Sequence, residues 1–148
     1  ARRDIKSTNL LAQVMAKHAA HKAGDYEALM IDPDGYVTEA GSSSFFYIKD
    51  GNLFLRPVTN EILHGITRQT MLRVAQQMDL RFVERVYKLD EVLQADEAFI
   101  TASSIYVLAV NRIDSHEIAG RQAGPFTNAL RKAYLKTARA EFYQPKSN

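Results

Sequence analysis

Short apolar segments separated by turn residues, over positions 26–57, constrain the fold more than any other feature of this chain. The segments are YEALMI, YVTEA, SSFFYIK and LFLRP, and the turn sequences DPDG and DGN separate two pairs of them. Aromatic and β-branched residues in short runs, bounded by Asp, Asn, Gly and Pro, are typical of β-strands joined by tight turns. The pattern therefore predicts antiparallel strands here, and the runs RFVERVY, EAFITA and YVLAVNRI predict further strands.

Helical periods flank these strands. The run GPFTNALRKAYLKTARAEFY predicts a closing helix with Pro125 near its first turn, GITRQTMLRVAQQM predicts a loop entering a helix, and LDEVLQA predicts a short one. Helices interspersed among hairpin-linked strands predict an α+β fold with a mixed or antiparallel sheet. A first helix is predicted from Leu10, Leu11, Val14, Met15 and Ala19, with Ser7, Thr8 or Asn9 as its cap and Gly24 at its end.

Composition limits the classes of function. The 148 residues suit one domain, and 46% hydrophobic with 24% charged residues is ordinary for a globular protein. A net charge of +2 without a dense basic run gives no indication of nucleic acid binding. The lack of cysteine excludes disulfides, thiolate metal sites and cysteine nucleophiles. No apolar stretch reaches membrane-spanning length and no signal peptide is visible, so we expect a cytoplasmic protein without membrane partners.

Two motifs have the chemistry of a ligand site. In GITRQ a glycine leads directly into a helix, whose free N–H groups can bind an anion, and Thr67 adds a hydroxyl. In TEAGSSSFF the carboxylate of Glu39 ends a strand and is followed by small residues, which allow a flat ligand to approach the backbone. Each motif also has a structural interpretation, as a threonine cap and as a solvated glutamate before a loop.

Weaker signals complete the set. In ITASSIYVLAV, Ser103 and Ser104 can donate hydrogen bonds to an anion or simply form a turn. Lys6, in DIKSTNLL, stands at a helix entrance and is either a surface lysine or a reactive amine. The four histidines show no metal-ligand spacing, so we expect no metal site, and no glycine-rich dinucleotide fingerprint is present.

The order of these motifs resembles the fold type IV pyridoxal-phosphate enzymes. It is most similar to the D-amino acid transaminases, with branched-chain aminotransferases and aminodeoxychorismate lyase as relatives, and it runs from DIKSTNLL through YVTEAGSSSFFYIKDG, ILHGITRQ and ADEAFITAS to GPFTNALRKAY. The resemblance implies mixed and antiparallel strands in a pseudo-barrel with flanking helices. It also implies that residues 1–143 form a C-terminal cofactor-binding domain whose N-terminal domain is absent. Residues 144–148 are predicted to be a disordered tail.

The same resemblance assigns roles to residues. Lys6 matches the lysine that forms the Schiff base with pyridoxal 5'-phosphate, and Glu39 matches the acid that pairs with the pyridine nitrogen. The remaining cofactor-binding matches are Ile66 and Thr67 at the phosphate-binding helix entrance, Ser103 near the phosphate, Leu63 against the ring and Ser42 beside it. Two positions depart from the family pattern: Ser44 stands where the family usually has Asn, and Arg56 precedes Pro57 where the family often has Thr.

The activity implied is transfer of an amino group from a D-amino acid to a 2-oxo acid, by a homodimer that needs its N-terminal domain. DIKSTNLL favours the D-amino acid transaminase and lyase branches, because the branched-chain enzymes carry a glycine-rich stretch after the lysine. Aminodeoxychorismate lyase and branched-chain aminotransferase remain as alternatives within the family. A non-catalytic α+β binding module is the alternative from a different class, and the retention of Lys6 and Glu39 counts against it.

Overall fold

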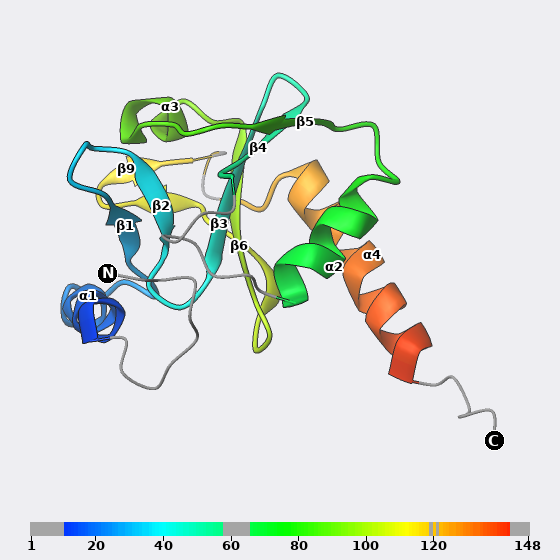
Figure 1. Ribbon diagram of the computed structural model, residues 1–148, viewed down its shortest axis with the longest axis horizontal. Helices are drawn as coiled ribbons and strands as arrows, with labels where there is room; N and C mark the ends of the chain where they lie inside the picture. Colours follow the sequence, from blue (N-terminus) through cyan, green and yellow to red (C-terminus); the bar gives the residue numbers. More distant parts are fainter. Residues whose placement is uncertain (1–10, 58–65, 119, 121, 143–148) are drawn as a thin grey trace.

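The computed structural model describes residues 11–57, 66–118, 120 and 122–142 (Figure 1). Four helices occur in these ranges: α1 (Leu11–Lys22), α2 (Ile66–Ala75), α3 (Leu89–Leu93) and α4 (Pro125–Phe142). The strands in the described ranges are β1 (Leu29–Ile31), β2 (Val37–Ala40), β3 (Ser44–Lys49), β4 (Asn52–Leu55), β5 (Arg81–Glu84), β6 (Glu97–Ala102), β7 (Tyr106–Ala109), β8 (Arg112–Ile113) and β9 (His116–Glu117). The predicted α+β class is confirmed, whereas the predicted tail, 144–148, lies outside the described residues.

A mixed sheet organises the described part of the chain, in the strand order β5-β4-β3-β6-β7. Neighbouring strands are antiparallel except β4 and β5, which run parallel because α2 lies between them in the sequence and returns the chain to the same end of the sheet. The β3–β4 hairpin turns at Asp50 and Gly51, both with positive φ, as the predicted DGN turn requires. The β1–β2 pair and the β8–β9 pair form separate small sheets.

The two faces of the main sheet carry separate apolar cores. On one face, Phe46, Ile48 and Phe99 pack with Met71 of α2 and Leu130 of α4. On the other face, Phe45, Tyr47 and Ile100 pack with residues from β2, α3 and the segment before α4, namely Val37, Val92 and Ile118. Alternation along β3 and β6 therefore sends successive side chains to different cores, as a strand buried on both faces requires.

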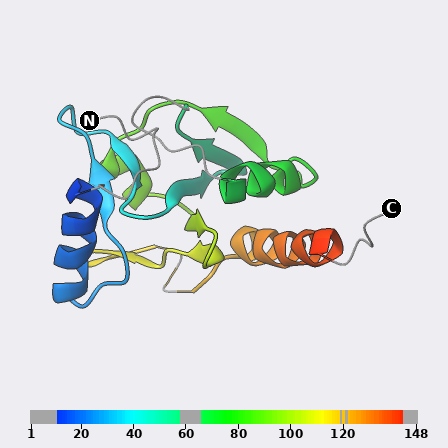
Figure 2. The ribbon, with the colours of Figure 1, turned by 60° about the horizontal axis from the view of Figure 1, so that its bottom comes forward.

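Helix α1 differs from its sequence expectation in its packing. It forms where the period predicts it, yet none of its residues is buried, and Leu11, Val14 and Met15 are 65%, 62% and 62% exposed. It lies at the opposite end of the molecule from α2 and α4 (Figure 2). The helical period therefore predicted the helix correctly, but its apolar residues are not covered by the rest of the described chain. No helix among the described residues is long and apolar enough to cross a membrane.

Candidate functional site

Three chain segments that carry predicted site residues end at one edge of the main sheet. They are the end of β2 with the turn that follows it, the first turn of α2 and the β6–β7 turn, and Figure 1 shows all three at the lower side of the molecule. Glu39 and Ser42 belong to the first segment, Ile66 and Thr67 to the second, and Ser103 to the third. Lys6 and Leu63 lie outside the described residues.

Glu39 is a buried carboxylate. It lies on β2, one residue before the end of the strand, and is only 7% exposed. A carboxylate at this depth is unfavourable unless a charge or hydrogen bond compensates it. Arg68, in the first turn of α2, supplies a positive charge that interacts with Glu39. Glu39 is therefore a buried carboxylate whose charge is balanced by Arg68, and it is not the solvent-exposed glutamate that the sequence also allowed.

Arg68 is itself almost completely buried, at 4% exposure. Its Nη2 donates to the carbonyl oxygen of Arg56 over 2.9 Å, and its guanidinium carbon lies 5.2 Å from the ring centroid of Phe46. Burial lowers the pKa of Arg68, and attraction to acidic groups, including Glu39, opposes that shift. A positive charge in the first turn of a helix interacts unfavourably with the helix dipole. The position of Arg68 at the start of a predicted helix was therefore the one feature of the sequence that could have indicated a specific role for it.

Arg56 explains one departure from the family pattern. Its Nη1 donates to the carbonyl oxygen of Val37 on β2 over 2.8 Å and also lies 3.4 Å from Oδ2 of Asp32. Asp32 in turn accepts the backbone N–H groups of Asp34 and Tyr36 in the DPDG turn. Through these contacts Arg56 fastens the β1–β2 hairpin, which carries Glu39, to the end of β4.

Ser42 takes part in a network that sequence reasoning missed. Its hydroxyl donates to Oε2 of Glu27 over 2.7 Å and accepts from Nζ of Lys17 over 2.9 Å. Glu27 also accepts the backbone N–H of Ala28 and the hydroxyl of Ser43. No local pattern could reveal this, because Glu27 lies fifteen residues before Ser42 in the chain. The hydroxyl of Ser42 is thus bonded to protein groups on both sides.

Thr67 and Ser103 occupy contrasting positions. Thr67 is buried in the first turn of α2, where backbone N–H groups lack intrahelical acceptors. Ser103 is exposed in the β6–β7 turn, which the Ile105 N–H closes by donating to the carbonyl oxygen of Ala102 over 3.3 Å. The turn ends at Tyr106, whose φ of 61° is unusual for a bulky residue. The predicted turn at the SS dipeptide is confirmed, and the exposed hydroxyl of Ser103 leaves its donation to an anion as a prediction.

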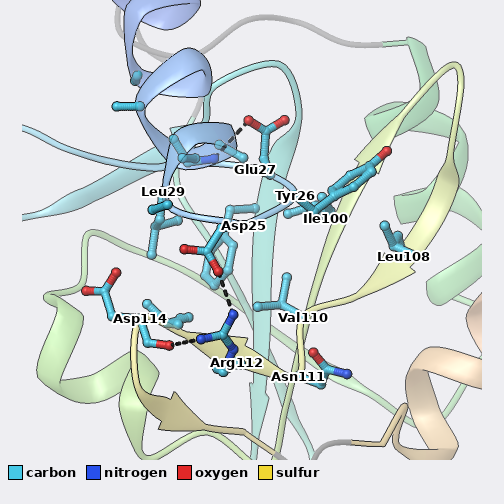
Figure 3. Close-up of a pocket in the computed structure, with 18 of the residues that line it drawn as sticks. Asp25, Tyr26, Glu27, Leu29, Ile100, Leu108, Val110, Asn111, Arg112 and Asp114 are labelled. Carbon is cyan, nitrogen blue, oxygen red and sulfur yellow. Dashed lines mark hydrogen bonds and ion pairs between the residues drawn. The ribbon is translucent and has the colours of Figure 1, made fainter.

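A cavity of about 600 Å³ lies elsewhere, between the second half of α1 and the strands β7 and β8 (Figure 3). Its walls are mostly small and apolar, including Ala19, Ala20, Ile100 and Leu108. The Arg112–Asp25 ion pair, 2.7 Å long, lies at its side. None of the predicted site residues that the structure describes lines this cavity. Within the described ranges, no group of three or more His, Asp or Glu side chains is placed to hold a metal ion.

Comparison with known proteins decides the family. The family model described as Amino-transferase class IV matches residues 1–113. The chain belongs to the class IV aminotransferases. Among curated class IV aminotransferases, D-alanine aminotransferase from Bacillus licheniformis is 39% identical over 138 residues, covering 93% of this chain and 48% of that protein. Branched-chain-amino-acid aminotransferase from Pseudomonas aeruginosa is 40% identical over 122 residues, covering 82% of this chain and 39% of that protein.

Solved structures of class IV aminotransferases share this fold. The holo-form of the branched-chain amino acid aminotransferase from Thermobaculum terrenum superposes with a TM-score of 0.89 at 31% identity, covering 95% of this chain and 46% of its own. The T.th. branched-chain amino acid aminotransferase complexed with N-(5'-phosphopyridoxyl)-L-glutamate gives a TM-score of 0.85 at 31% identity, covering 93% and 45%. The chain thus spans about half the length of the relatives it matches.

Proposed function

We propose that the protein transfers an amino group from a D-amino acid to a 2-oxo acid with the help of pyridoxal 5'-phosphate. The observation that carries this proposal is the meeting of a buried carboxylate, Glu39, and a helix N-terminus, that of α2, at one edge of the sheet. Similarity to D-alanine aminotransferases supports the donor, and solved relatives in pyridoxal-phosphate form support the cofactor. Because the chain covers about half of those proteins, the proposal concerns the whole protein.

The residues at this edge suit a phosphorylated pyridine. The first turn of α2 offers backbone N–H groups at Ile66 and Thr67, and a helix N-terminus favours a phosphate dianion. Thr67 and Ser103 add hydroxyls for the same group. Glu39 suits the ring nitrogen at the other end of the cofactor, because it is a buried carboxylate that interacts with the positive charge of Arg68. Ser42 and Leu63 are proposed to lie beside the ring.

The chemistry divides between the cofactor and this chain. When bound, pyridoxal phosphate supplies a ring that withdraws electrons from the α-carbon of the substrate. Glu39 holds a proton on the ring nitrogen, which increases that withdrawal. The Nζ atom of Lys6 is the base that takes the α-proton and later returns it. The α2 terminus and Ser103 would hold the phosphate and so fix the orientation of the bound cofactor.

Branched-chain substrates are the second candidate. The 40% identity to the Pseudomonas aeruginosa enzyme and the likeness to solved branched-chain aminotransferases favour it. An assay with D-alanine and 2-oxoglutarate, beside one with L-leucine and 2-oxoglutarate, separates the two. A pyruvate-release assay with an amino-chorismate substrate tests the lyase alternative from the same family.

The remaining proposal concerns assembly. We infer that residues 1–143 form the cofactor-binding domain of a homodimeric enzyme, in which a further domain supplies the groups that grip the substrate carboxylate. The half-length coverage of the relatives supports this inference. Size-exclusion chromatography with light scattering of the whole protein tests the dimer.

The deciding experiment adds pyridoxal phosphate to the purified protein and follows its visible absorbance. We expect a band that borohydride abolishes, and a peptide carrying the reduced cofactor on Lys6. A protein with Lys6→Ala should show neither, while keeping its circular dichroism spectrum. A pyridoxal phosphate spectrum unchanged by the wild-type protein would contradict the proposed function.

A further inference from the structure

One buried hydroxyl near the candidate site has no hydrogen-bond partner among the described residues. Thr101 on β6 is 2% exposed, and its Oγ1 makes no hydrogen bond within the part of the chain that the structure describes. A buried polar group left unpaired destabilises a fold by roughly 1–3 kcal/mol. Such groups are few in native proteins, and each calls for an explanation such as a ligand or an ordered water. A second buried threonine hydroxyl, that of Thr127 at the start of α4, has an acceptor in Glu97 over 2.7 Å.

Strand register assigns Thr101 to the face of the sheet that α2 covers. Thr101 lies directly opposite Val107 of β7, and Val107 belongs to the apolar core formed with Met71 of α2. Directly opposed residues of antiparallel strands point to the same face. On β3, Ser44 lies opposite Thr101, two residues beyond the Phe46–Phe99 pair toward the β6–β7 turn. Thr101 and Ser44 are thus the polar end of an otherwise apolar face.

That polar end lies by the N-terminus of α2. The guanidinium of Arg68 lies over the Phe46 ring, so the first turn of α2 is close to the Phe46–Phe99 pair. Residues before Arg68 continue toward the β6–β7 turn, as Figure 1 shows for the start of α2. The unpaired hydroxyl therefore lies on the sheet face that α2 covers, at the end toward the start of that helix, whose first N–H groups lack intrahelical acceptors.

We propose that Thr101 is a further phosphate-binding residue, whose hydroxyl donates a hydrogen bond to the phosphate of pyridoxal phosphate at the N-terminus of α2. This assignment rests on the proposed function and adds a residue to it. A phosphate oxygen is a strong acceptor, and a hydrogen bond to a charged group is stronger than one between neutral groups. Protein atoms cover the hydroxyl in this structure, so binding of the phosphate requires these atoms to move aside.

The assignment predicts opposite effects of one substitution on stability and on affinity. Thr101→Val keeps the shape of the side chain and removes the hydroxyl. Without cofactor, the variant should be more stable than the wild type, because an unpaired buried polar group is gone. Its dissociation constant for pyridoxal phosphate should rise about tenfold, because one charge-assisted hydrogen bond is lost. Thr101→Ser keeps the hydroxyl and should bind pyridoxal phosphate within about twofold of the wild type.

The experiment uses the whole purified protein and four measurements. Urea unfolding without cofactor gives stability, and fluorescence titrations give dissociation constants for pyridoxal phosphate, for pyridoxal and for inorganic phosphate. Pyridoxal lacks the phosphate, so its affinity should not change in Thr101→Val. The matched control is Thr127→Val, which removes a paired hydroxyl from α4 and should lower stability without changing any affinity.

The outcomes separate this assignment from the proposed function. Unchanged affinity of Thr101→Val for pyridoxal phosphate, or an equal loss for pyridoxal, overturns the role of Thr101 alone. A loss confined to inorganic phosphate means that the site takes a free anion, and it overturns the assignment to the cofactor. If the wild-type protein binds no pyridoxal phosphate, the proposed function fails, and the assignment to Thr101 fails with it.

Discussion

The hydroxyl of Ser42 lies 2.7 Å from Oε2 of Glu27 and donates a hydrogen bond to it, which ties the β2–β3 turn to the segment after α1. The neighbouring Gly41 packs closely against the same side chain, because a Cβ atom there would lie 2.9 Å from Oε1 of Glu27 and would displace the carboxylate. The carboxylate and the glycine together fix the turn that directly follows Glu39. The conformation of the candidate site therefore depends on a residue outside it.

Glu27→Gln should destabilise the protein by about 1–3 kcal/mol. The carboxylate of Glu27 only accepts hydrogen bonds, whereas the glutamine amide has an NH₂ group that donates. In either orientation this NH₂ group would point at another donor, either the N–H of Ala28 or the N–H and hydroxyl of Ser42. Urea unfolding of the purified protein measures the change. The control is Asp25→Asn, which breaks the exposed ion pair with Arg112 and should cost less than about 1 kcal/mol. Equal effects of the two variants would contradict the importance of the hydrogen-bond network around Glu27.

A second buried carboxylate, Glu97, holds the start of α4. Its Oε1 accepts the N–H of Phe126 over 3.0 Å, and its Oε2 accepts both the N–H and the hydroxyl of Thr127 over 2.7 Å. Glu97→Gln should lower the free energy of unfolding by about 2 kcal/mol, since hydrogen bonds to a charged acceptor are lost. The exposed Glu84→Gln is the control. Hydrogen exchange at the first turn of α4 should rise in Glu97→Gln alone, and uniform exchange changes would argue against a local cap.

Asp32 should make stability depend on pH in the acid range. Burial works to raise the pKa of Asp32, but hydrogen bonds from the Tyr36 N–H, the Arg56 guanidinium and the Asp34 N–H outweigh burial and lower it. A lowered folded-state pKa stabilises the fold above the unfolded value, about 3.9, and this contribution is lost as the pH falls through the folded value. The stability difference between wild type and Asp32→Asn should therefore be full at pH 7 and shrink below about pH 4. A difference that stayed constant from pH 7 to pH 2 would show that the carboxylate charge contributes nothing.

Local patterns in the sequence predicted most elements of the fold. The DPDG and DGN turns form as expected, because aspartate side chains and positive-φ residues determine such turns locally. The run YVLAVNRI was predicted as one strand, but it divides into β7 and β8, and β9 was not predicted. The β8–β9 pair is only two residues long on each side, too short to produce a period-two pattern.

The candidate site was predictable only where a motif is continuous in sequence. Glu39 and Thr67 were found because a strand end and a helix entrance have local signatures. Glu27 and Thr101 were not, because their importance comes from contacts across the fold. Glu27 accepts hydrogen bonds from a turn fifteen residues further along the chain, and Thr101 lies opposite Ser44 on a neighbouring strand. Such contacts depend on strand register, which a single sequence does not specify.

Thr67→Ala should weaken pyridoxal phosphate binding more than it slows the reaction. The backbone N–H groups of the first turn of α2 remain, and only one hydroxyl is lost, so we expect a penalty of about 1 kcal/mol in cofactor affinity. Titration of cofactor-free protein measures it. Thr70→Ala, one turn further along α2, is the control and should leave affinity unchanged. Equal affinities for Thr67→Ala and wild type would move the phosphate away from this helix end.

Glu39→Gln should reduce the rate far more than it reduces cofactor binding. An amide does not hold a proton on the ring nitrogen, so the cofactor withdraws electrons less strongly from the α-carbon. Losing a charge-assisted hydrogen bond in the transition state is worth about 1.5–3 kcal/mol, which corresponds to a rate reduction of roughly ten- to a hundredfold. Single-turnover measurements isolate this step, and Glu39→Asp, which keeps the charge, should recover part of the rate. Because the charge of Glu39 interacts favourably with the buried Arg68, the neutral variant also leaves that cation less compensated, so Glu39→Gln should be less stable than wild type even without cofactor. If Glu39→Gln reacted at the wild-type rate, Glu39 would be a structural partner of Arg68 and not the acid at the ring nitrogen.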